Sequence, residues 1–196
     1  MIRVLLAGIT TGLRVGELLA MKWGNLDWNI EKCYVKETML RAGGGHASGF
    51  APPKTDTSVA PTNLTPSSIK ALQQHRRRQP EYRLEAGGSY QDIDLISATS
   101  AGTPSDSCNI VKKIFHPSFK AGGLHRIRFH DLRPTCASFL INQGESPKYI
   151  QSQLLHTSID MTFDQYGHLF PGAGKEAAAR MDEALFGIQE RLERAA

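Results

Sequence analysis

The side chains best suited to phosphate chemistry gather in the second half of the chain. Between Lys112 and Arg133 there are six lysine or arginine residues and one acid, Asp131, together with three histidines. Guanidinium groups stay charged at any working pH and donate hydrogen bonds in a planar fork, and imidazole transfers protons near neutral pH. The stretch leads into the motif FHDLRPT (129–135). This arrangement favours attraction of phosphate over a merely solvated basic face.

Four segments resemble the tyrosine recombinase (phage integrase) family, and they occur in the order that this family has. They are TGLRVGELLAMKW (11–23), PPKTDTSVAPTNLT (52–65), FHDLRPTCASFLI (129–141) and QLLHTSIDMTFDQYGHLFP (153–171). Each segment alone is a modest signal, but four in register span nearly the whole chain. The resemblance implies a catalytic domain that is mainly α-helical with a small antiparallel β-sheet.

The resemblance also implies six catalytic residues, which are Arg14, Lys54, His130, Arg133, His156 and Tyr166. In the family, attack by the tyrosine oxygen on a DNA phosphodiester forms a 3′-phosphotyrosyl link and frees a 5′-hydroxyl. The two arginines and His156 would bind the non-bridging oxygens, where charge develops. His130 would assist the movement of the tyrosine proton, and Lys54 would protonate the leaving oxygen.

Each of these residues also has a structural interpretation. Arg14 and Glu17 have the i,i+3 spacing of a surface ion pair on a helix. Lysines on hairpins, such as Lys54, are usually solvated. His130 and Arg133 lie where a helix cap or salt bridge is plausible, His156 suits an interhelix histidine, and Tyr166 a packed aromatic. Tyr149 is expected to be a packed aromatic of that kind.

We expect no metal and no cofactor. The histidines do not pair at a helix-face i,i+4 spacing, and no cysteine pairs with them. By the resemblance, the arginines take the role that Mg²⁺ has in many nucleases. The expected partner is double-stranded DNA, and the residues predicted to contact it are Lys112, Lys113, Lys120, Arg126 and Arg128.

The sequence departs from the family pattern at two positions. Pro134 replaces the second histidine of HDLRHT, and a proline near the start of a helix costs little. Leu155 replaces the glycine of QLGHSS. If that position has a positive φ, leucine there is strained. If it needs close packing, leucine pushes His156 outward. Both changes bear on activity, not on family membership.

The bulk properties are those of a globular protein of one sizeable domain. The chain has 196 residues, of which 40% are hydrophobic and 21% charged, with a net charge of +4. No apolar run is long enough to cross a membrane, and the N-terminus lacks the features of a signal peptide. The three cysteines are scattered and without a CxxC motif. They indicate reduced thiols in a cytoplasmic protein.

The expected elements begin with the end of a helix at 2–8 and a helix at 15–23. Strands follow at 33–38, near 49–54 and near 58–63, with a loop at 41–49 and a turn at 55–57. Thr65 and Pro66 open a helix to about Arg78, and 79–88 reads as irregular. A short extended piece is expected at 94–97, and Ser105 is expected to cap a helix through Lys120.

The remaining chain is predicted to be helical. Asp131 caps a helix through Asn142 that Gly144 ends, and Ser146 and Ser158 open two more, to Leu154 and toward Gln165. Residues 1–172 are expected to form the catalytic domain and 173–196 a tail helix. The tail helix, over 175–193, carries an apolar stripe of Met181, Leu185, Ile188 and Leu192. The stripe is predicted to pack on a second copy of the chain or to stay partly exposed, and covering of its own domain is the structural alternative.

Met1 lies only thirteen residues before Arg14. The core-binding domain of the family is therefore expected to be absent, and the domain to be N-terminally shortened by truncation, an internal start or gene decay. The favoured function is an enzyme that cuts and rejoins DNA during integration or excision of a mobile element. A weakened remnant that still binds DNA or a partner integrase is the alternative. Type IB topoisomerases share the chemistry, but the HDLR and YGHLFP motifs are more similar to integrases.

Overall fold

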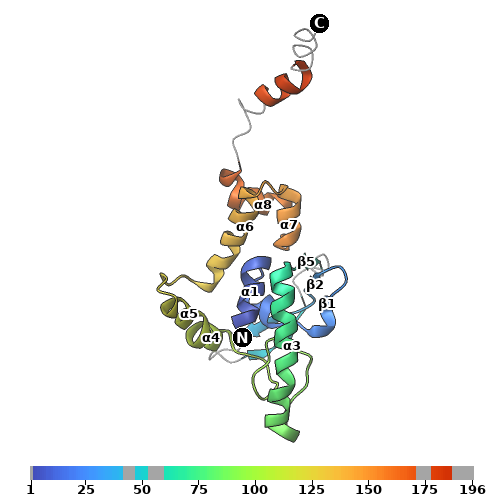
Figure 1. Cartoon of the computed structure of the whole chain (residues 1–196), viewed down its shortest axis with the longest axis vertical. Helices are drawn as coiled ribbons and strands as arrows, with labels where there is room; N and C mark the ends of the chain where they lie inside the picture. Colours follow the sequence, from blue (N-terminus) through green and yellow to red (C-terminus); the bar gives the residue numbers. More distant parts are fainter. Residues whose placement is uncertain (1, 42–46, 53–59, 171–177, 187–196) are drawn as a thin grey trace.

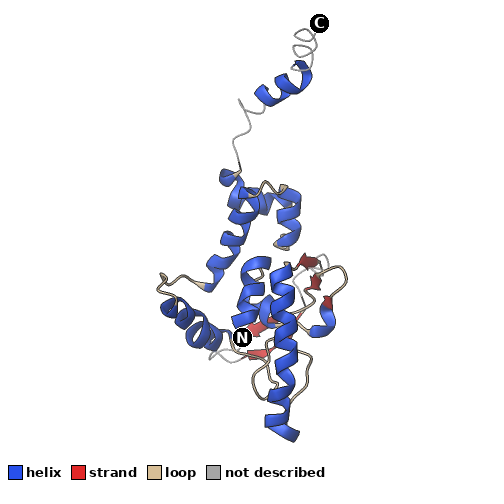
Figure 2. Ribbon diagram, in the orientation of Figure 1, coloured by secondary structure: helices blue, strands red, loops and turns tan. Residues whose placement is uncertain are grey.

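The computed structural model describes residues 2–41, 47–52, 60–170 and 178–186. The body is mainly α-helical, with short antiparallel strands, of which β1 (Leu26–Asp27), β2 (Lys32–Tyr34) and β5 (Pro61–Asn63) lie beyond α3 (Pro66–Ala86) at the right in Figures 1 and 2. This confirms the predicted fold class. None of the described helices is long and apolar enough to cross a membrane. The three cysteines are unpaired, as predicted.

Three helices build the front of the body. Helix α1 (Ile2–Thr11) lies against α3 (Pro66–Ala86), and α2 (Val15–Leu19) follows α1 closely (Figure 1). The helix expected at 15–23 is shorter, because α2 ends at Leu19. Trp23 instead begins a 3₁₀ segment, η1 (Trp23–Asn25), and the Trp23 N–H donates to the Asp94 carbonyl. Of the extended piece expected at 94–97, only Leu95 forms a β-bridge, which pairs with Lys22, and residues 96–97 form a turn.

Helix α3 is longer than the sequence predicted. Thr65 caps it as expected, since its hydroxyl accepts from the Ser68 N–H. The prediction that 79–88 is irregular was wrong, because the helix continues through Pro80 to Ala86. Residues 81–86 (EYRLEA) include several good helix formers, which outweigh the cost of one proline. A short 3₁₀ turn, η3 (Gly87–Ser89), follows.

Among the described residues, five strands form two small antiparallel sheets. One sheet has the order β1 (Leu26–Asp27), β2 (Lys32–Tyr34) and β5 (Pro61–Asn63), and the other pairs β3 (Thr38–Arg41) with β4 (Ala47–Ala51). The strand predicted at 33–38 is therefore two strands. The strands near 49–54 and 58–63 were predicted as neighbours across a turn, but each pairs with an earlier strand instead.

A second group of helices carries the later motifs. Residues 107–121 are helical in three pieces, α4 (Ser107–Ile110), the π-helical η4 (Val111–Phe115) and α5 (His116–Ala121). A 3₁₀ turn, η5 (Phe129–Asp131), leads to α6 (Leu132–Asn142). Then come α7 (Pro147–Gln153), α8 (Ile159–Tyr166) and η6 (Gly167–Leu169).

Most of the predicted caps of these helices are confirmed. Ser146 and Ser158 accept from backbone N–H groups at the starts of α7 and α8. Gly144 has a φ of 79° after α6. The predicted cap at Ser105 was wrong by one residue, since Asp106 caps α4. Asp131 precedes α6 but gives it no side-chain cap; its carboxylate instead accepts from the Arg128 N–H and closes η5.

The buried apolar residues form two clusters. The larger joins the front helices to the three-stranded sheet and includes Leu18, Cys33, Leu72 and Phe129. The smaller lies among α6, α7 and α8 and consists of Cys136, Ala137, Ile141, Ile150, Leu154 and Tyr166. Leu13 of the first motif belongs to the larger cluster, and a Cβ added at the adjacent Gly12 would meet Leu154 and Cys136 of the smaller one.

The tail is described over residues 178–186, which are helical and fully on the surface. Met181 is 65% exposed and Leu185 57% exposed. In Figure 1 this helix stands clear of the body. Ile188 and Leu192 of the predicted stripe lie outside the described residues. The division of the chain after residue 172 stays a prediction.

Candidate active site

Gly12 fixes the start of the site. It has a φ of +67°, and a Cβ added there would lie 2.4 Å from Leu154 Cδ2, so this position needs a glycine for both conformation and space. Its carbonyl accepts a hydrogen bond of 2.8 Å from Arg133 Nη1. The tight turn between α1 and α2 thereby connects the first motif to the third.

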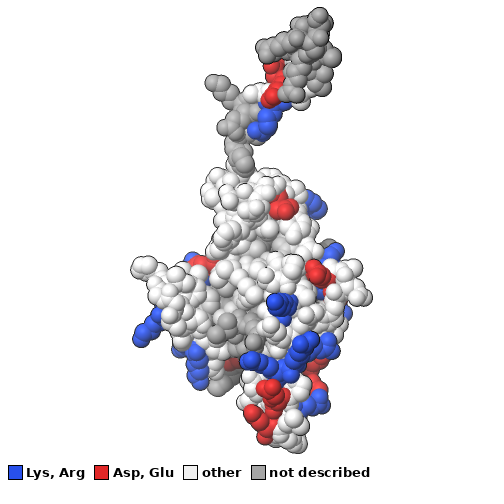
Figure 3. All heavy atoms as spheres, viewed as in Figure 1, with Lys and Arg blue, Asp and Glu red and all other residues white. Residues whose placement is uncertain are grey.

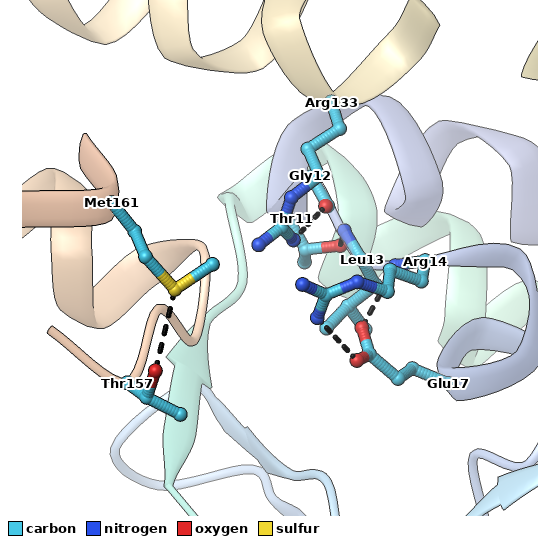
Figure 4. A network of polar contacts seen from close by, with 8 residues as sticks. All are labelled: Thr11, Gly12, Leu13, Arg14, Glu17, Arg133, Thr157 and Met161. Carbon is cyan, nitrogen blue, oxygen red and sulfur yellow. Dashed lines mark hydrogen bonds and ion pairs between the residues drawn. The ribbon is translucent and has the colours of Figure 1, made fainter. Parts of the chain in front are cut away.

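Arg14 lies two residues later, at the N-cap of α2. Its Nη1 donates to Glu17 Oε1 at 2.9 Å, and its backbone N–H donates to Glu17 Oε2 at 2.8 Å. The i,i+3 pair predicted as a structural alternative is therefore present. The Arg14 side chain is nevertheless 45% exposed, and in Figure 4 its guanidinium group lies beside that of Arg133.

Arg133 comes from the first turn of α6 and is buried. Its Nη2 is buried as well and has no hydrogen-bond partner among the described residues. Burial, and next the charge of Arg14, lowers the pKa of Arg133 to about 10, so the group remains charged at neutral pH. Pro134 follows in the same turn and leaves the contact with Gly12 intact.

His156 is presented by a turn that ends α7. The Leu155 N–H donates to the Ser152 carbonyl and the His156 N–H to the Gln151 carbonyl, which is the hydrogen-bond pattern of a Schellman motif. Leu155 has a φ of +55° in the left-handed position of that motif. Of the two predicted alternatives, a positive φ at Leu155 is therefore the one present, and His156 is not pushed outward, since it is only 6% exposed. Its side chain packs against the larger core cluster.

The His156 ring is buried between α7 and α8. Its Nδ1 lies 2.8 Å from the Thr162 hydroxyl, and its ring stacks on that of Tyr166 with centroids 6.2 Å apart and an interplanar angle of 9°. Burial, then the charges of Arg133 and Arg14, lowers the pKa of His156 to about 4. The ring is therefore neutral near pH 7 and suited to donating a hydrogen bond.

Tyr166 is the last residue of α8 and only 6% exposed. It packs in the smaller core cluster, so the alternative of a packed aromatic applies to its ring. Burial raises the pKa of Tyr166, while the nearby charges of Arg133 and Arg14 oppose that rise. These couplings bring Tyr166, His156 and both arginines into one group. Tyr149 is half-buried on α7.

His130 is exposed and lines a cavity of about 600 Å³ that also borders Arg14, Arg126 and Arg128. Arg128 forms an exposed ion pair of 2.8 Å with Asp131. The remaining predicted DNA contacts, Lys112, Lys113 and Lys120, are exposed on η4 and α5, which adjoin this cavity through Val111 and His116. In the view of Figure 3, basic side chains are spread over the lower half of the body, with acidic side chains among them.

Of the six predicted site residues, four form one group, and His130 shares a cavity with Arg14. Lys54 lies outside the described residues. Sequence reasoning missed Thr162, which holds the His156 ring, and the role of Gly12 as acceptor for Arg133. A glycine directly before Leu-Arg was a visible signal for the second; a threonine six residues after a histidine was not.

Comparisons with known proteins identify the family of the chain. The model of the phage integrase family matches residues 2–172. The ICEBs1 integrase of Bacillus subtilis (strain 168) is 32% identical over 175 residues, 89% of this chain and 46% of the relative. A XerC-like tyrosine recombinase of Caldanaerobacter subterraneus subsp. tengcongensis is 30% identical over 88% of this chain and 46% of its own. The chain thus spans about half the length of these relatives.

Solved structures share the fold. The Tn1549 transposon integrase in complex with circular intermediate DNA has a TM-score of 0.70 at 19% identity, over 93% of this chain and 58% of its own. The XerA recombinase has a TM-score of 0.58 at 20% identity, over 90% and 54%. With the family model covering nearly all of the chain up to the tail, this protein belongs to the phage integrase family of tyrosine recombinases.

Proposed function

We propose that this chain is the strand-cleaving part of a site-specific DNA recombinase that acts in the integration or excision of a mobile element. One observation carries the proposal: Arg14 and Arg133 lie side by side, and the only carboxylate paired with either, among the described residues, is Glu17 on Arg14. Two adjacent guanidinium groups repel each other unless an anion binds between them. A DNA phosphate supplies that anion.

In the proposed reaction the Tyr166 oxygen attacks the phosphorus, and a bond from phosphorus to tyrosine replaces the bond to the 5′-oxygen of the DNA. The tyrosine proton leaves with the help of His130, and the 5′-oxygen departs as a hydroxyl after protonation by Lys54. Attack by the 5′-hydroxyl of a second strand reverses these steps and releases the tyrosine. No external energy source is consumed, because the phosphodiester bond is exchanged and not hydrolysed.

The electrostatics of the described residues support these assignments. Charge grows on the non-bridging oxygens in the transition state, and fixed donors directed at them lower the barrier. Arg133 offers Nη2, which lacks a partner in the described part of the chain. His156 is neutral near pH 7 and is held in place through Nδ1, which leaves Nε2 to donate to the phosphate.

Double-stranded DNA is the proposed partner, bound by the basic residues that border the cavity. Assembly of two or more copies on DNA through the tail helix, and a cytoplasmic location, are part of the same proposal. The structure of a lambda integrase dimer bound to a core site, with a TM-score of 0.51, gives one precedent for a dimer on DNA within this fold.

A weakened remnant that binds DNA without cutting it is the second candidate. Two observations favour it: Leu155 is in a strained conformation directly before His156, and Tyr166 is almost fully buried. A nucleophile in this position must become accessible before it reaches a phosphate. The two candidates differ in one product, the covalent complex.

The test is to incubate the chain with a pool of nicked duplexes of random sequence, in which cleavage next to the nick releases a short fragment and traps the adduct. The recombinase proposal predicts an adduct that survives denaturation and maps to Tyr166. Tyr166→Phe must abolish it while binding DNA normally. Binding without any adduct, in the chain whose folding has been verified, would identify the remnant.

A further inference from the structure

Gln153 is a buried amide at the junction of three segments. It is the last residue of α7 and only 3% exposed. Its Oε1 accepts from the backbone N–H of Asn63 at 3.0 Å and from Asn63 Nδ2 at 3.2 Å. Its Nε2 donates to the carbonyls of Asn63 at 2.9 Å and of Thr10 at 3.5 Å. Its own carbonyl accepts from the Thr62 hydroxyl at 3.1 Å.

Each of these segments leads to the candidate site. Thr10 lies at the end of α1, two residues before the glycine whose carbonyl holds Arg133. Asn63 lies in β5, within the motif (52–65) that also contains Lys54. Gln153 itself begins the turn that presents His156. The Gln153 side chain therefore connects the turn that presents His156 to the end of α1 and to strand β5.

The chemistry of this position favours a specific role over simple packing. The neighbours of Gln153 along α7 and its turn, Ile150 and Leu154, are fully buried apolar residues. An apolar side chain at residue 153 would fill the same space but leave the Asn63 N–H and carbonyl without their partners. Buried amides with all their hydrogen bonds made fix one relative position of the segments they join, which apolar contacts do less sharply.

We infer that Gln153 is a positioning residue for DNA cleavage, which holds the His156 turn, the end of α1 and strand β5 in one fixed arrangement. The inference rests on the proposed function for its effect on cleavage. Its effect on His156 itself does not depend on that function, because it concerns only how firmly the turn holds the ring among Thr162, Tyr166 and the arginines.

Gln153→Met tests the inference, with Gln79→Met as matched control. Gln79 is also a bridging glutamine: its Oε1 accepts from Trp23 Nε1 at 2.6 Å and its Nε2 donates to the Leu95 carbonyl at 2.8 Å. It joins α3 to η1 and the 94–97 segment, away from the candidate site. Both variants lose side-chain hydrogen bonds and stability, so only Gln153→Met should change the site.

Two readouts apply to the whole 196-residue chain. The first is the titration of the His156 imidazole by NMR without DNA. We expect Gln153→Met to shift its pKa upward from about 4 toward the ordinary value of 6.5, because the loosened turn admits water, and Gln79→Met to leave it unchanged. The second is adduct formation with a duplex selected from the random pool. At saturating DNA we expect a rate about 10- to 100-fold lower for Gln153→Met with unchanged DNA affinity.

Gln153→Glu guards against a Met variant that fails to fold. An ionised carboxylate has no proton to donate to the Asn63 and Thr10 carbonyls, but a protonated one does. Its cleavage rate relative to the unchanged chain should therefore recover as the pH falls. If the unchanged chain forms no adduct, the proposed function fails and the imidazole titration still decides this inference. An unshifted His156 pKa in Gln153→Met would overturn it.

Discussion

At the scale of single residues, the notable feature is a charge imbalance held inside the fold. Arg133 is buried beside a second arginine, and within the described part of the chain its hydrogen-bond partner is one backbone carbonyl and it forms no ion pair with a carboxylate. Such a group costs stability when the site is empty, because a buried charge needs partners. The arrangement is understandable if the missing partner is the anion on which the protein acts.

Arg14→Lys should separate charge from geometry at this site. Lysine keeps the positive charge but lacks the planar guanidinium fork. It therefore stabilises the negative charge that develops on a phosphate oxygen less well. We expect adduct formation to slow by about 100-fold with DNA affinity changed little. Single-turnover cleavage measures this, with Arg83→Lys, in an exposed ion pair on α3, as control. Equal rates for the two variants would remove Arg14 from the proposed clamp.

His156 gives a pH dependence of stability whose sign follows from its burial. Its pKa is about 4 in the folded chain against 6.5 ordinarily, so between these values the unfolded chain takes up a proton that the folded chain does not. The stabilisation is complete above about pH 6.5 and is lost as the pH falls toward 4. The expected loss is about 3 kcal/mol relative to a His156→Gln variant. Parallel pH profiles of the two unfolding free energies would contradict this.

At this scale the sequence predicted which residues come together better than it predicted their hydrogen-bond partners. Arg14, Arg133, His156 and Tyr166 were found because their residue types and motifs are specific, and the structure brings them together. Thr162 and Gln153 were not found, because a threonine or glutamine has no type-specific signature. Their partners lie on other elements, and only the folded chain shows which of them are buried against the site.

At the scale of elements, local signals predicted helix starts well and strand pairing poorly. Ser146 and Ser158 cap helices through bonds to residues three positions on, which a sequence displays directly. The pairing of β2 with β5 joins residues far apart in the chain, and strands of three residues carry too little pattern to fix a partner. Helix α3 continues beyond Pro80 because the residues that follow favour a helix.

In the turn after α7, we expect a glycine variant to be more stable than an alanine variant, which is the reverse of the usual order. At Leu155, with a positive φ, glycine relieves strain that alanine keeps. Leu155→Gly should therefore be more stable than Leu155→Ala by about 1 kcal/mol. At the preceding residue, Leu154, φ is −85° and the ordinary order should hold, with alanine the more stable. Chemical denaturation of the four variants measures their unfolding free energies. If the alanine variant were the more stable at both positions, Leu155 would not be strained.

At the scale of the whole molecule, the basic side chains near the cavity are expected to account for the affinity of the chain for DNA. Lys112 and Lys113 are exposed on η4. We expect weak binding with little sequence preference and a steep salt dependence, because each phosphate contact releases counterions. Changing both lysines to glutamine should reduce the slope of log affinity against log salt by about 2 if each contacts one phosphate. Arg77→Gln with Arg78→Gln, on exposed α3 positions, removes the same charge as control.

The tail helix provides the last prediction, which concerns assembly. Met181 and Leu185 lie one turn apart and are both largely exposed, so the body of the chain does not need them for its core. Exposed apolar residues on one helix face are a surface for another chain. Met181→Glu with Leu185→Glu should leave the unfolding free energy within about 0.5 kcal/mol of the unchanged chain. The same double variant should prevent complexes with two copies on one DNA duplex.

Native gel mobility and mass measurement of the DNA complexes distinguish one bound copy from two. Ala179→Glu with Ala184→Glu adds the same charges at exposed positions of the same helix and should assemble normally. Loss of assembly in both double variants would attribute the effect to charge and not to the apolar face. Unfolding of the chain by Met181→Glu with Leu185→Glu would instead mean that the helix covers its own domain, and this would contradict assembly of two copies through the tail helix.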